Sequence, residues 1–346
     1  MSETNQKIDW KHLFEGYSKE IPIVLHNFPD PDAIASAMGI QHVLKHHGHK
    51  PGSIYYTGEV SHPQNKSMVT LLNLSLINYE EEPFEDGQKV ILVDTNNVGP
   101  GSNQDVINPD RASVAAVVDH HKGKFPKGAK VDNRFVGSTA SIVYDYLQDC
   151  AFDFETDDGK LLATALMVGL FTDTNSMMSE SVSELDIEAY RNLHMYVDRQ
   201  KLVSIMDYPL PMYLFDLRQK AFMDENKEII ESTIISGIGR ISQSKRDALP
   251  IIADEFLRMT GIMTCVVFAI IDDHIDISVR SKDVALDVGD FVQKVFGSGG
   301  GKHGSGGAVI PLGFFSSNGD KAIADDTWEL AKRLVFTKVE SSVKGE

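Results

Sequence analysis

The chain has 346 residues, of which 42% are hydrophobic, enough to form the cores of two domains of ordinary size. Its 33 lysines and arginines stand against 50 aspartates and glutamates, a formal net charge of −17, which argues against binding long duplex nucleic acid through a broad basic surface. Two distant cysteines, a polar N-terminal segment and apolar runs too short to span a bilayer predict a cytoplasmic protein without membrane spans.

Three short apolar runs each end at residues of the types that bind metals. They are 21–26, ending at His26; 90–94, ending at Asp94; and 113–121, ending at Asp119, His120 and His121. Helical patterns such as 33–47 alternate with these runs, which predicts an α/β fold with a doubly wound parallel sheet. Ligands bind beyond the carboxyl ends of the strands in such sheets, so we expect these residues to meet at one edge.

Further along the chain, helices are predicted at 138–150, 158–173 and 183–197. Residues 198–226 are interpreted as a linker that contains a helix. It would join a first domain at 1–197 to a smaller α/β domain at 227–346. In the second domain, 264–281 is typical of two strands joined by a turn, and a glycine-rich loop at 297–307 follows.

The segment HNFPDPD (26–32) places two carboxylates close to an imidazole. Pro29 and Pro31 restrict its backbone, so one rigid turn can present both Asp30 and Asp32. Across the first domain, the candidate metal ligands are His26, Asp30, Asp32, Asp94, His120 and Asp173.

Four carboxylates and two imidazoles without a thiolate suit divalent ions such as Mn²⁺ or Mg²⁺. Six side chains are too many for one open catalytic ion, but they suit two ions that share a bridging carboxylate. Two such ions lie roughly 3.5–4 Å apart and can activate a water for attack on a phosphoryl group. We therefore expect two divalent ions, with Mn²⁺ as the first choice and Mg²⁺ or another ion as the alternative.

These motifs, in this order, resemble the DHH phosphoesterase superfamily, which takes its name from the triplet found here at 119–121. The resemblance covers most of the chain and implies metal-binding roles. His26 and Asp30 would hold one ion, while Asp32, His120 and Asp173 would hold the other. Asp94 would bridge the two ions.

The resemblance also implies roles around the metals. Asp119 would orient a histidine, and His121 would contact the scissile phosphate or assist the leaving group. The turn Gly137-Ser138-Thr139 opens a helix, so the backbone amides at Ser138 and Thr139 would hold phosphate.

The glycine-rich segment contains Gly299, Gly300, Gly301, Lys302 and His303. It is not a Walker P-loop, because the first glycine of that motif would fall at Phe296 and its Ser/Thr at His303. It resembles the motif of the DHH-associated C-terminal domain in the RecJ-like, oligoribonuclease branch, which implies that these residues close over substrate.

On the strand before that segment, Arg280 and Ser281 would contact phosphate. Lys302 departs from the common pattern, in which the histidine follows the glycines directly. We expect this lysine to favour a substrate with an additional phosphate.

The resemblance implies a cytoplasmic, manganese-dependent phosphodiesterase that hydrolyses short single-stranded oligonucleotides, or linear or cyclic dinucleotides, to mononucleotides. The alternatives are a phosphatase for 3'-phosphoadenosine 5'-phosphate, an inorganic pyrophosphatase or exopolyphosphatase, and a nucleotide sensor without catalysis. Related proteins are often dimers, so a homodimer is a further expectation.

Several of these residues also have structural interpretations. Asp173 could cap a helix end, and the glycine-rich segment could be a flexible connector. Asp272 to His274 is interpreted as a hairpin turn. The histidine cluster His42, His46, His47 and His49 is interpreted as a solvated helix end, since no carboxylate or cysteine accompanies it.

Overall fold

The computed structural model describes residues 7–96, 112–302, 304–316 and 321–345. The chain forms two compact units, Met1–Pro209 and Leu210–Glu346. The segment 198–226, which we predicted as the linker, contributes helix α7 to the first unit and helix α8 to the second. Within the described residues, no helix is both long and apolar enough to cross a membrane.

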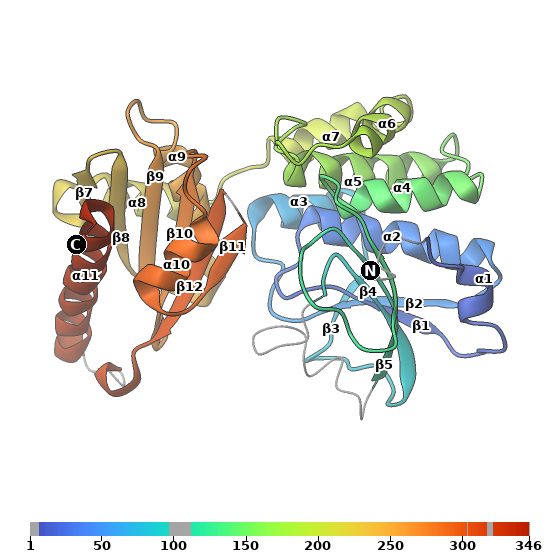
Figure 1. Ribbon diagram of the computed structural model, residues 1–346, viewed down its shortest axis with the longest axis horizontal. Coiled ribbons are helices and arrows are strands. Elements are labelled where there is room, and N and C mark those ends of the chain that lie inside the picture. The colour runs from blue at the N-terminus through green and yellow to red at the C-terminus, as the bar shows by residue number, and fades with distance from the viewer. Residues whose placement is uncertain (1–6, 97–111, 303, 317–320, 346) are drawn as a thin grey trace. The chain divides into compact units, whose positions relative to one another are not determined.

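The first unit contains a sheet of parallel strands and the helices that follow them (Figure 1). Its elements are α1 (Trp10–Leu13), β1 (Ile21–Val24), α2 (Pro31–His46), β2 (Pro51–Tyr56), α3 (Pro63–Leu71), β3 (Leu76–Asn78), β4 (Gln88–Val93), β5 (Ala112–Asp119), β6 (Lys130–Asn133), α4 (Thr139–Asp149), α5 (Asp157–Asp173), α6 (Glu184–Leu193) and α7 (Arg199–Met206).

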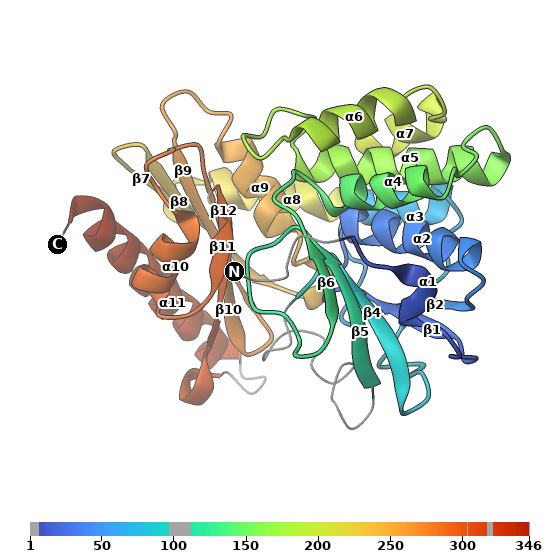
Figure 2. The same ribbon diagram turned by 45° about the vertical axis from the view of Figure 1, so that its right-hand side comes forward.

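The strand order of this sheet is β3-β2-β1-β4-β5-β6, and every pairing is parallel. The order reverses between β1 and β4, so the loops after these two strands leave in different directions and open a crevice at the carboxyl edge. Figure 2 shows β5 and β6 running beside β4. The parallel sheet is as predicted, and β1, β4 and β5 bring their terminal residues to one edge.

Helix α2 lies between the sheet and the pair α4 and α5 (Figures 1 and 2). Nearly all of its first ten residues are alanine, isoleucine or other small or apolar residues, and all ten are buried. Gly39 allows the close approach of α4, since a Cβ there would be 2.3 Å from Cγ1 of Val143. This tight packing holds the middle of α2 directly against α4.

The second unit contains a mixed sheet with the order β11-β12-β10-β9-β8-β7, in which only β8 and β9 pair in parallel among the described strands. Helices α8 and α9 pack on one face, and α10 and α11 pack on the other. Its elements are α8 (Met212–Phe222), β7 (Lys227–Ile230), β8 (Thr233–Ile241), α9 (Ala248–Phe256), β9 (Thr264–Ile271), β10 (His274–Ser281), α10 (Val288–Phe296), β11 (Gly300–Lys302), β12 (Ser305–Pro311) and α11 (Lys321–Lys344).

The glycine-rich segment 297–307 differs from the predicted loop, and it is not a flexible connector. Most of it forms β11 and the start of β12, which pair antiparallel with Gly300 opposite Gly307 and Gly301 opposite Gly306. A Cβ on Gly301 would be 2.2 Å from the carbonyl oxygen of Ser305, so the strands could not approach this closely with larger residues. The glycines therefore have a structural reason in addition to any role at a substrate. The turn predicted at 272–274 is confirmed, since β9 and β10 form a hairpin there.

Candidate metal centre

The loop after β1 supplies the first three candidate ligands. His26 lies two residues after the end of the strand, and its Nδ1 lies 2.8 Å from the carbonyl oxygen of Asn27. Asp30 is the N-cap of α2, where its Oδ1 accepts a hydrogen bond from the amide of Ala33. The helix begins at Pro31, two residues before the predicted start, because proline is well suited to the first helical position. Asp32 therefore belongs to the first turn of a buried helix and not to the loop.

Asp94 follows β4 and has a left-handed backbone conformation, with φ of 56°. This conformation is uncommon for a residue other than glycine, and it is found where a functional geometry is held by its surroundings. The carboxylate is fully buried, and its Oδ1 accepts a hydrogen bond of 2.7 Å from the hydroxyl of Thr139. Helix α4 thus supports the residue predicted to bridge the two ions.

The triplet at the end of β5 is organised by its first member, Asp119. Oδ1 of buried Asp119 accepts hydrogen bonds from the amides of His120 and His121 at 2.8 and 3.1 Å and from Nδ1 of His121 at 2.8 Å. Its Oδ2 accepts one from Asn96 at 2.6 Å. Burial raises the pKa of Asp119, but the hydrogen bonds and charge of His121 outweigh that influence and lower it overall. Asp119 thereby fixes the His121 ring with Nδ1 as the donor, which leaves Nε2 for another partner.

The carboxyl edge brings all six predicted ligands together. Three groups of these side chains have ligand atoms within 4.8 Å of one another, a geometry that could hold a metal ion. The groups are His26, Asp30 and Asp94; Asp32, His120 and Asp173; and Asp94, His120 and His121. Asp94 and His120 each belong to two groups, so the clusters are adjacent rather than separate.

Backbone carbonyls hold Nδ1 of both histidines, which leaves Nε2 of each ring for a metal. Because a carbonyl can only accept, Nδ1 of His26 donates to Asn27, and Nδ1 of His120 donates to Val136 at 3.1 Å. In the neutral rings, the lone pair then belongs to Nε2. That atom lies 3.7 Å from Asp30 in His26, and 3.1 Å from Asp173 in His120. Two electron-pair donors facing each other need a cation between them, as in carbonyl–histidine–metal arrangements.

The charges of this cluster also indicate that the site needs a bound cation. Burial is the largest influence on the pKa values of Asp32 and Asp94 and raises both, and repulsion from neighbouring carboxylates raises them further. Burial alone would lower the pKa of His26, but the Asp30 and Asp94 carboxylates raise it to about 10. In the absence of a metal, protons would therefore supply the positive charge that the site requires.

One oxygen gives the most direct test of whether a metal fits. Oδ2 of Asp94 is fully buried and accepts no hydrogen bond from any residue that the structure describes. Its neighbour is Nε2 of His26 at 3.8 Å, too distant for a hydrogen bond. A buried carboxylate oxygen without a donor is costly, and coordination of a cation is the usual compensation. The donor set fits hard or intermediate divalent ions.

The turn before α4 differs from the prediction. Ser138 and Thr139 are fully buried, and their amides already donate to the carboxylates of Asp186 and Asp32 at 3.3 and 2.7 Å. The expectation that these amides hold phosphate therefore finds no support. Their role in this structure is to orient carboxylates, Thr139 through both its amide and its hydroxyl.

Asp186 was missed by the sequence reasoning. It is buried in the first turn of α6 and accepts hydrogen bonds from the amides of Gly137 and Ser183 at 2.8 and 2.7 Å and from the hydroxyl of Ser141 at 2.6 Å. Gly137 has no room for a side chain, since a Cβ there would be 2.6 Å from Thr174. The available signal was the capping box that Ser183 and Asp186 form, although it would have predicted only a helix start.

The predicted substrate residues of the second unit lie at one end of its sheet. Arg280 is partly buried and donates to Asp254 at 3.1 Å, while the hydroxyl of Ser281 contacts that of Thr264 at 2.9 Å. Ser281 is buried by these contacts, which gives it a structural role. Gly299, with φ of 98°, precedes the paired Gly300 and Gly301. His303 and the side chain of Lys302 lie outside the described residues.

Comparisons with known proteins identify both units. The family model for the DHH family, N-terminal domain, matches residues 20–170, and the model for the DHHA1 domain matches 233–326. An uncharacterized protein of Methanocaldococcus jannaschii is 34% identical over 325 residues, which cover 93% of this chain and 64% of that protein. A probable manganese-dependent inorganic pyrophosphatase of Staphylococcus saprophyticus is 26% identical over 207 residues, which cover 59% of this chain and 61% of that enzyme.

Among solved structures, the crystal structure of an exopolyphosphatase-related protein from Bacteroides fragilis matches with a TM-score of 0.67 at 16% identity. The match covers 97% of this chain and 99% of that one, so the two proteins share a fold. The chain spans less than two thirds of the length of the two sequence relatives above.

Proposed function

The chain belongs to the DHH phosphoesterase superfamily, and from that premise we propose that it is a metal-dependent phosphodiesterase. Its substrates would be short oligonucleotides or dinucleotides, linear or cyclic, which it would hydrolyse to mononucleotides. The observation that carries the proposal is the set of three overlapping ligand groups at this edge, in which Asp94 and His120 each belong to two groups. A site for one ion would not need so many carboxylates and imidazoles in adjacent groups.

In this proposal, His26 and Asp30 would hold one divalent ion, Asp32, His120 and Asp173 would hold the other, and Asp94 would be a ligand of both. Mn²⁺ is the expected ion, which agrees with the name of the staphylococcal relative. The bound ions would act as Lewis acids toward the phosphoryl group and would lower the pKa of a water.

The chain's own residues would supply orientation and a proton. Asp119 holds Nδ1 of His121, so Nε2 can point toward the scissile phosphate or the leaving oxygen. Hydrolysis breaks the bond from phosphorus to the leaving oxygen, and a protonated His121 could pass its proton to that oxygen. The lowered pKa of Asp119 keeps its carboxylate ionised beside the His121 ring.

A pyrophosphatase or exopolyphosphatase is the second candidate, and two observations favour it. One sequence relative is a probable inorganic pyrophosphatase, and the solved structure of similar fold is exopolyphosphatase-related. Against this candidate stands the DHHA1 model in the second unit, since we expect that domain in the oligonucleotide-degrading branch.

A substrate panel separates these candidates. Purified protein with Mn²⁺ would be given pApA, pGpG, cyclic di-AMP, cyclic di-GMP, 3'-phosphoadenosine 5'-phosphate, a short RNA and pyrophosphate, with an EDTA-treated sample as the control. Release of mononucleotides from dinucleotides or RNA is the expected result. Phosphate release from the bisphosphate or from pyrophosphate alone would replace the proposal with the corresponding phosphatase. Nucleotide binding without turnover of any substrate would indicate a sensor.

A further inference from the structure

An exposed aromatic residue precedes a residue whose carbonyl oxygen contacts one of the candidate ligands. Phe135 is in the connection from β6 to α4, and its side chain is 77% exposed. The next residue, Val136, is buried, and its carbonyl oxygen lies 3.1 Å from Nδ1 of His120. Since consecutive Cα atoms are about 3.8 Å apart, Phe135 lies one residue from a direct contact with a predicted ligand.

The backbone on both sides of Phe135 is held firmly. Before it, Arg134 makes a bidentate ion pair with buried Asp132, at 2.9 and 2.7 Å, and also donates to Asp145. After it, the amide of Gly137 donates to buried Asp186 at 2.8 Å. The ring is therefore presented to solvent from a rigid segment. With its backbone held, an aromatic side chain has only two side-chain torsions to order when it binds a ligand.

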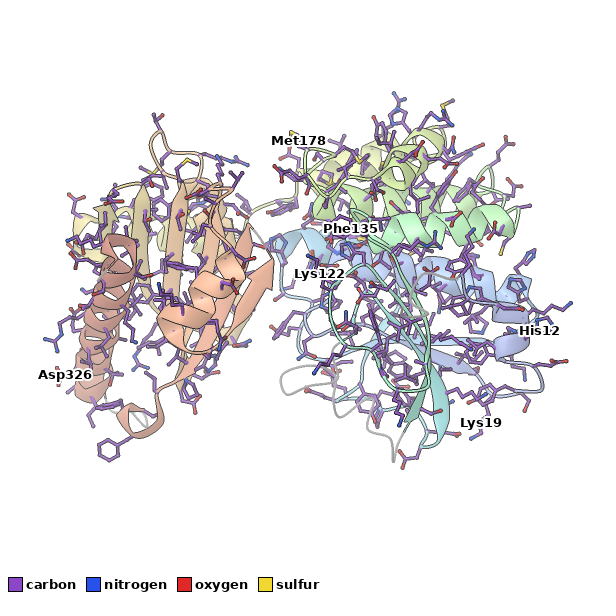
Figure 3. All side chains as sticks on the ribbon, in the orientation of Figure 1. His12, Lys19, Lys122, Phe135, Met178 and Asp326 are labelled. Carbon is purple, nitrogen blue, oxygen red and sulfur yellow. The ribbon has the colours of Figure 1, made fainter. Side chains whose placement is uncertain are left out.

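A cation accompanies the ring. Nζ of Lys122 lies 6.0 Å from the centroid of Phe135, and Figure 3 labels both side chains. Lys122 follows His121, whose carbonyl oxygen accepts hydrogen bonds from Asn133 at 2.9 Å and Asn96 at 3.3 Å. The lysine is therefore also attached to a segment fixed at the metal edge, and its charge contrasts with the acidic character of the chain as a whole.

We propose that Phe135 and Lys122 form a platform on which a nucleobase of the substrate stacks while its phosphodiester lies at the metal centre. The proposal rests on the proposed function and deepens it, because it assigns the residues that select nucleotides. Base stacking on an aromatic ring is tolerant of sequence, and a neighbouring cation suits an anionic, planar ligand. Pyrophosphate has no planar group, so the exposed ring would contribute nothing to its binding.

The test compares Phe135→Ala with the wild-type full chain on pApA and on two pApA analogues, each lacking one base. Loss of stacking with one base should lower kcat/KM for pApA roughly 5- to 150-fold, mainly through KM. The analogue that lacks the stacked base should show little further loss. Phe135→Trp should retain activity on pApA, and Phe314→Ala, which removes another highly exposed phenylalanine, is the matched control.

Binding gives a readout that does not depend on turnover. A dinucleotide containing 2-aminopurine should lose fluorescence on binding to the wild-type protein in the presence of Ca²⁺, and Phe135→Ala should abolish that quenching. Equal losses of kcat/KM on pApA and both analogues, or unchanged kinetics with unchanged quenching, would overturn the platform. If the wild-type protein hydrolyses pyrophosphate but no dinucleotide, the proposed function fails. In that case the 2-aminopurine assay alone tests the platform, and a lack of quenching by the wild-type protein would refute the inference.

Discussion

Replacing Gly169 by alanine tests whether α5 positions a carboxylate of the candidate metal centre. A Cβ at this position would lie 2.9 Å from Cα of Asp32, 3.1 Å from its Oδ1 and 3.2 Å from the carbonyl oxygen of Pro31. Ordinary contacts of a Cβ begin at 3.4 Å, so the start of α2 would have to move by about 0.5 Å. A flexible side chain cannot relieve this contact, because two of the three atoms belong to the backbone.

The expected effect on stability is modest. Overpacking of a core costs about 1–3 kcal/mol, while alanine is favoured over glycine within a helix by about 1 kcal/mol. The free energy of unfolding should therefore fall by about 0–2 kcal/mol, which lowers Tm by at most roughly 8 °C for a unit of this size. The effect on metal binding should be larger, because functional sites tolerate displacements of only about 0.5 Å. We expect a loss of Mn²⁺ affinity of roughly 10- to 100-fold.

Isothermal titration of Mn²⁺ into the chelator-treated, dialysed protein measures this affinity without a substrate, and differential scanning fluorimetry measures Tm. Gly39→Ala is the matched control, since its Cβ would also press on a neighbouring helix, but its three nearest atoms belong to the side chains of Val143 and Leu147. That variant should lose stability and keep its Mn²⁺ affinity. If Gly169→Ala binds Mn²⁺ as tightly as the wild-type protein does, α5 does not position Asp32, and the reasoning is wrong.

Three further predictions concern charge in the first unit. Asp94→Ala should lower turnover of the best substrate roughly 1,000-fold, because it removes a carboxylate that belongs to two of the three ligand groups. Exposed Asp86→Ala should leave turnover unchanged, and equal activities of the two variants would refute the assignment. In EDTA, Tm should fall as pH rises from about 6.5 to about 10. The carboxylates of Asp30 and Asp94 raise the pKa of His26 in the folded protein to about 10, whereas its pKa in the unfolded chain is about 6.5. Protonated His26 therefore stabilises the folded protein fully below pH 6.5, and this stabilisation is lost as pH rises through 10. A flat or rising Tm in fluorimetry over that range would contradict this. Asp186→Ala should lower the free energy of unfolding, measured in urea titrations, by about 3 kcal/mol, because several amides lose their acceptor. A loss under about 1 kcal/mol would show that water replaces the carboxylate.

The sequence allowed the site to be located because strand ends are easy to recognise. Apolar runs that stop at His26, Asp94 and Asp119 predict a parallel sheet, and parallel strands must bring their carboxyl ends to one edge. No knowledge of packing was needed for this step. Asp173 follows a different logic: it ends a helix rather than a strand, and only the packing of α5 against α2 brings it near the others.

The errors occurred where tertiary contacts decide which partner a polar group takes. A helix start with small polar residues resembles an anion site, but the amides of Ser138 and Thr139 are taken by carboxylates from distant parts of the chain. A run of glycines resembles a loop, yet Gly300 and Gly301 pair in a sheet because no side chain separates the strands. Local patterns contain no information about such partners, so they could not have predicted either outcome.

The distribution of hydrogen-bond donors explains why the ions are expected around Asp94. The other buried carboxylates of the first unit accept hydrogen bonds from described residues of the chain itself. Asp132 forms an ion pair with Arg134, Asp186 accepts hydrogen bonds from amides and hydroxyls, and Asp119 accepts one from Nδ1 of His121. Each is thereby compensated and needs no external charge.

Asp32 and Asp94 differ from these carboxylates. Asp32 accepts two amides from the start of α4, at 2.7 and 2.8 Å, but burial and its carboxylate neighbours still raise its pKa. Asp94 has a hydroxyl at one oxygen and, among the described residues, no donor at the other. A fold that compensates its structural carboxylates so fully, and leaves these two under-compensated at the switch point of the sheet, requires positive charge from outside the chain at that point.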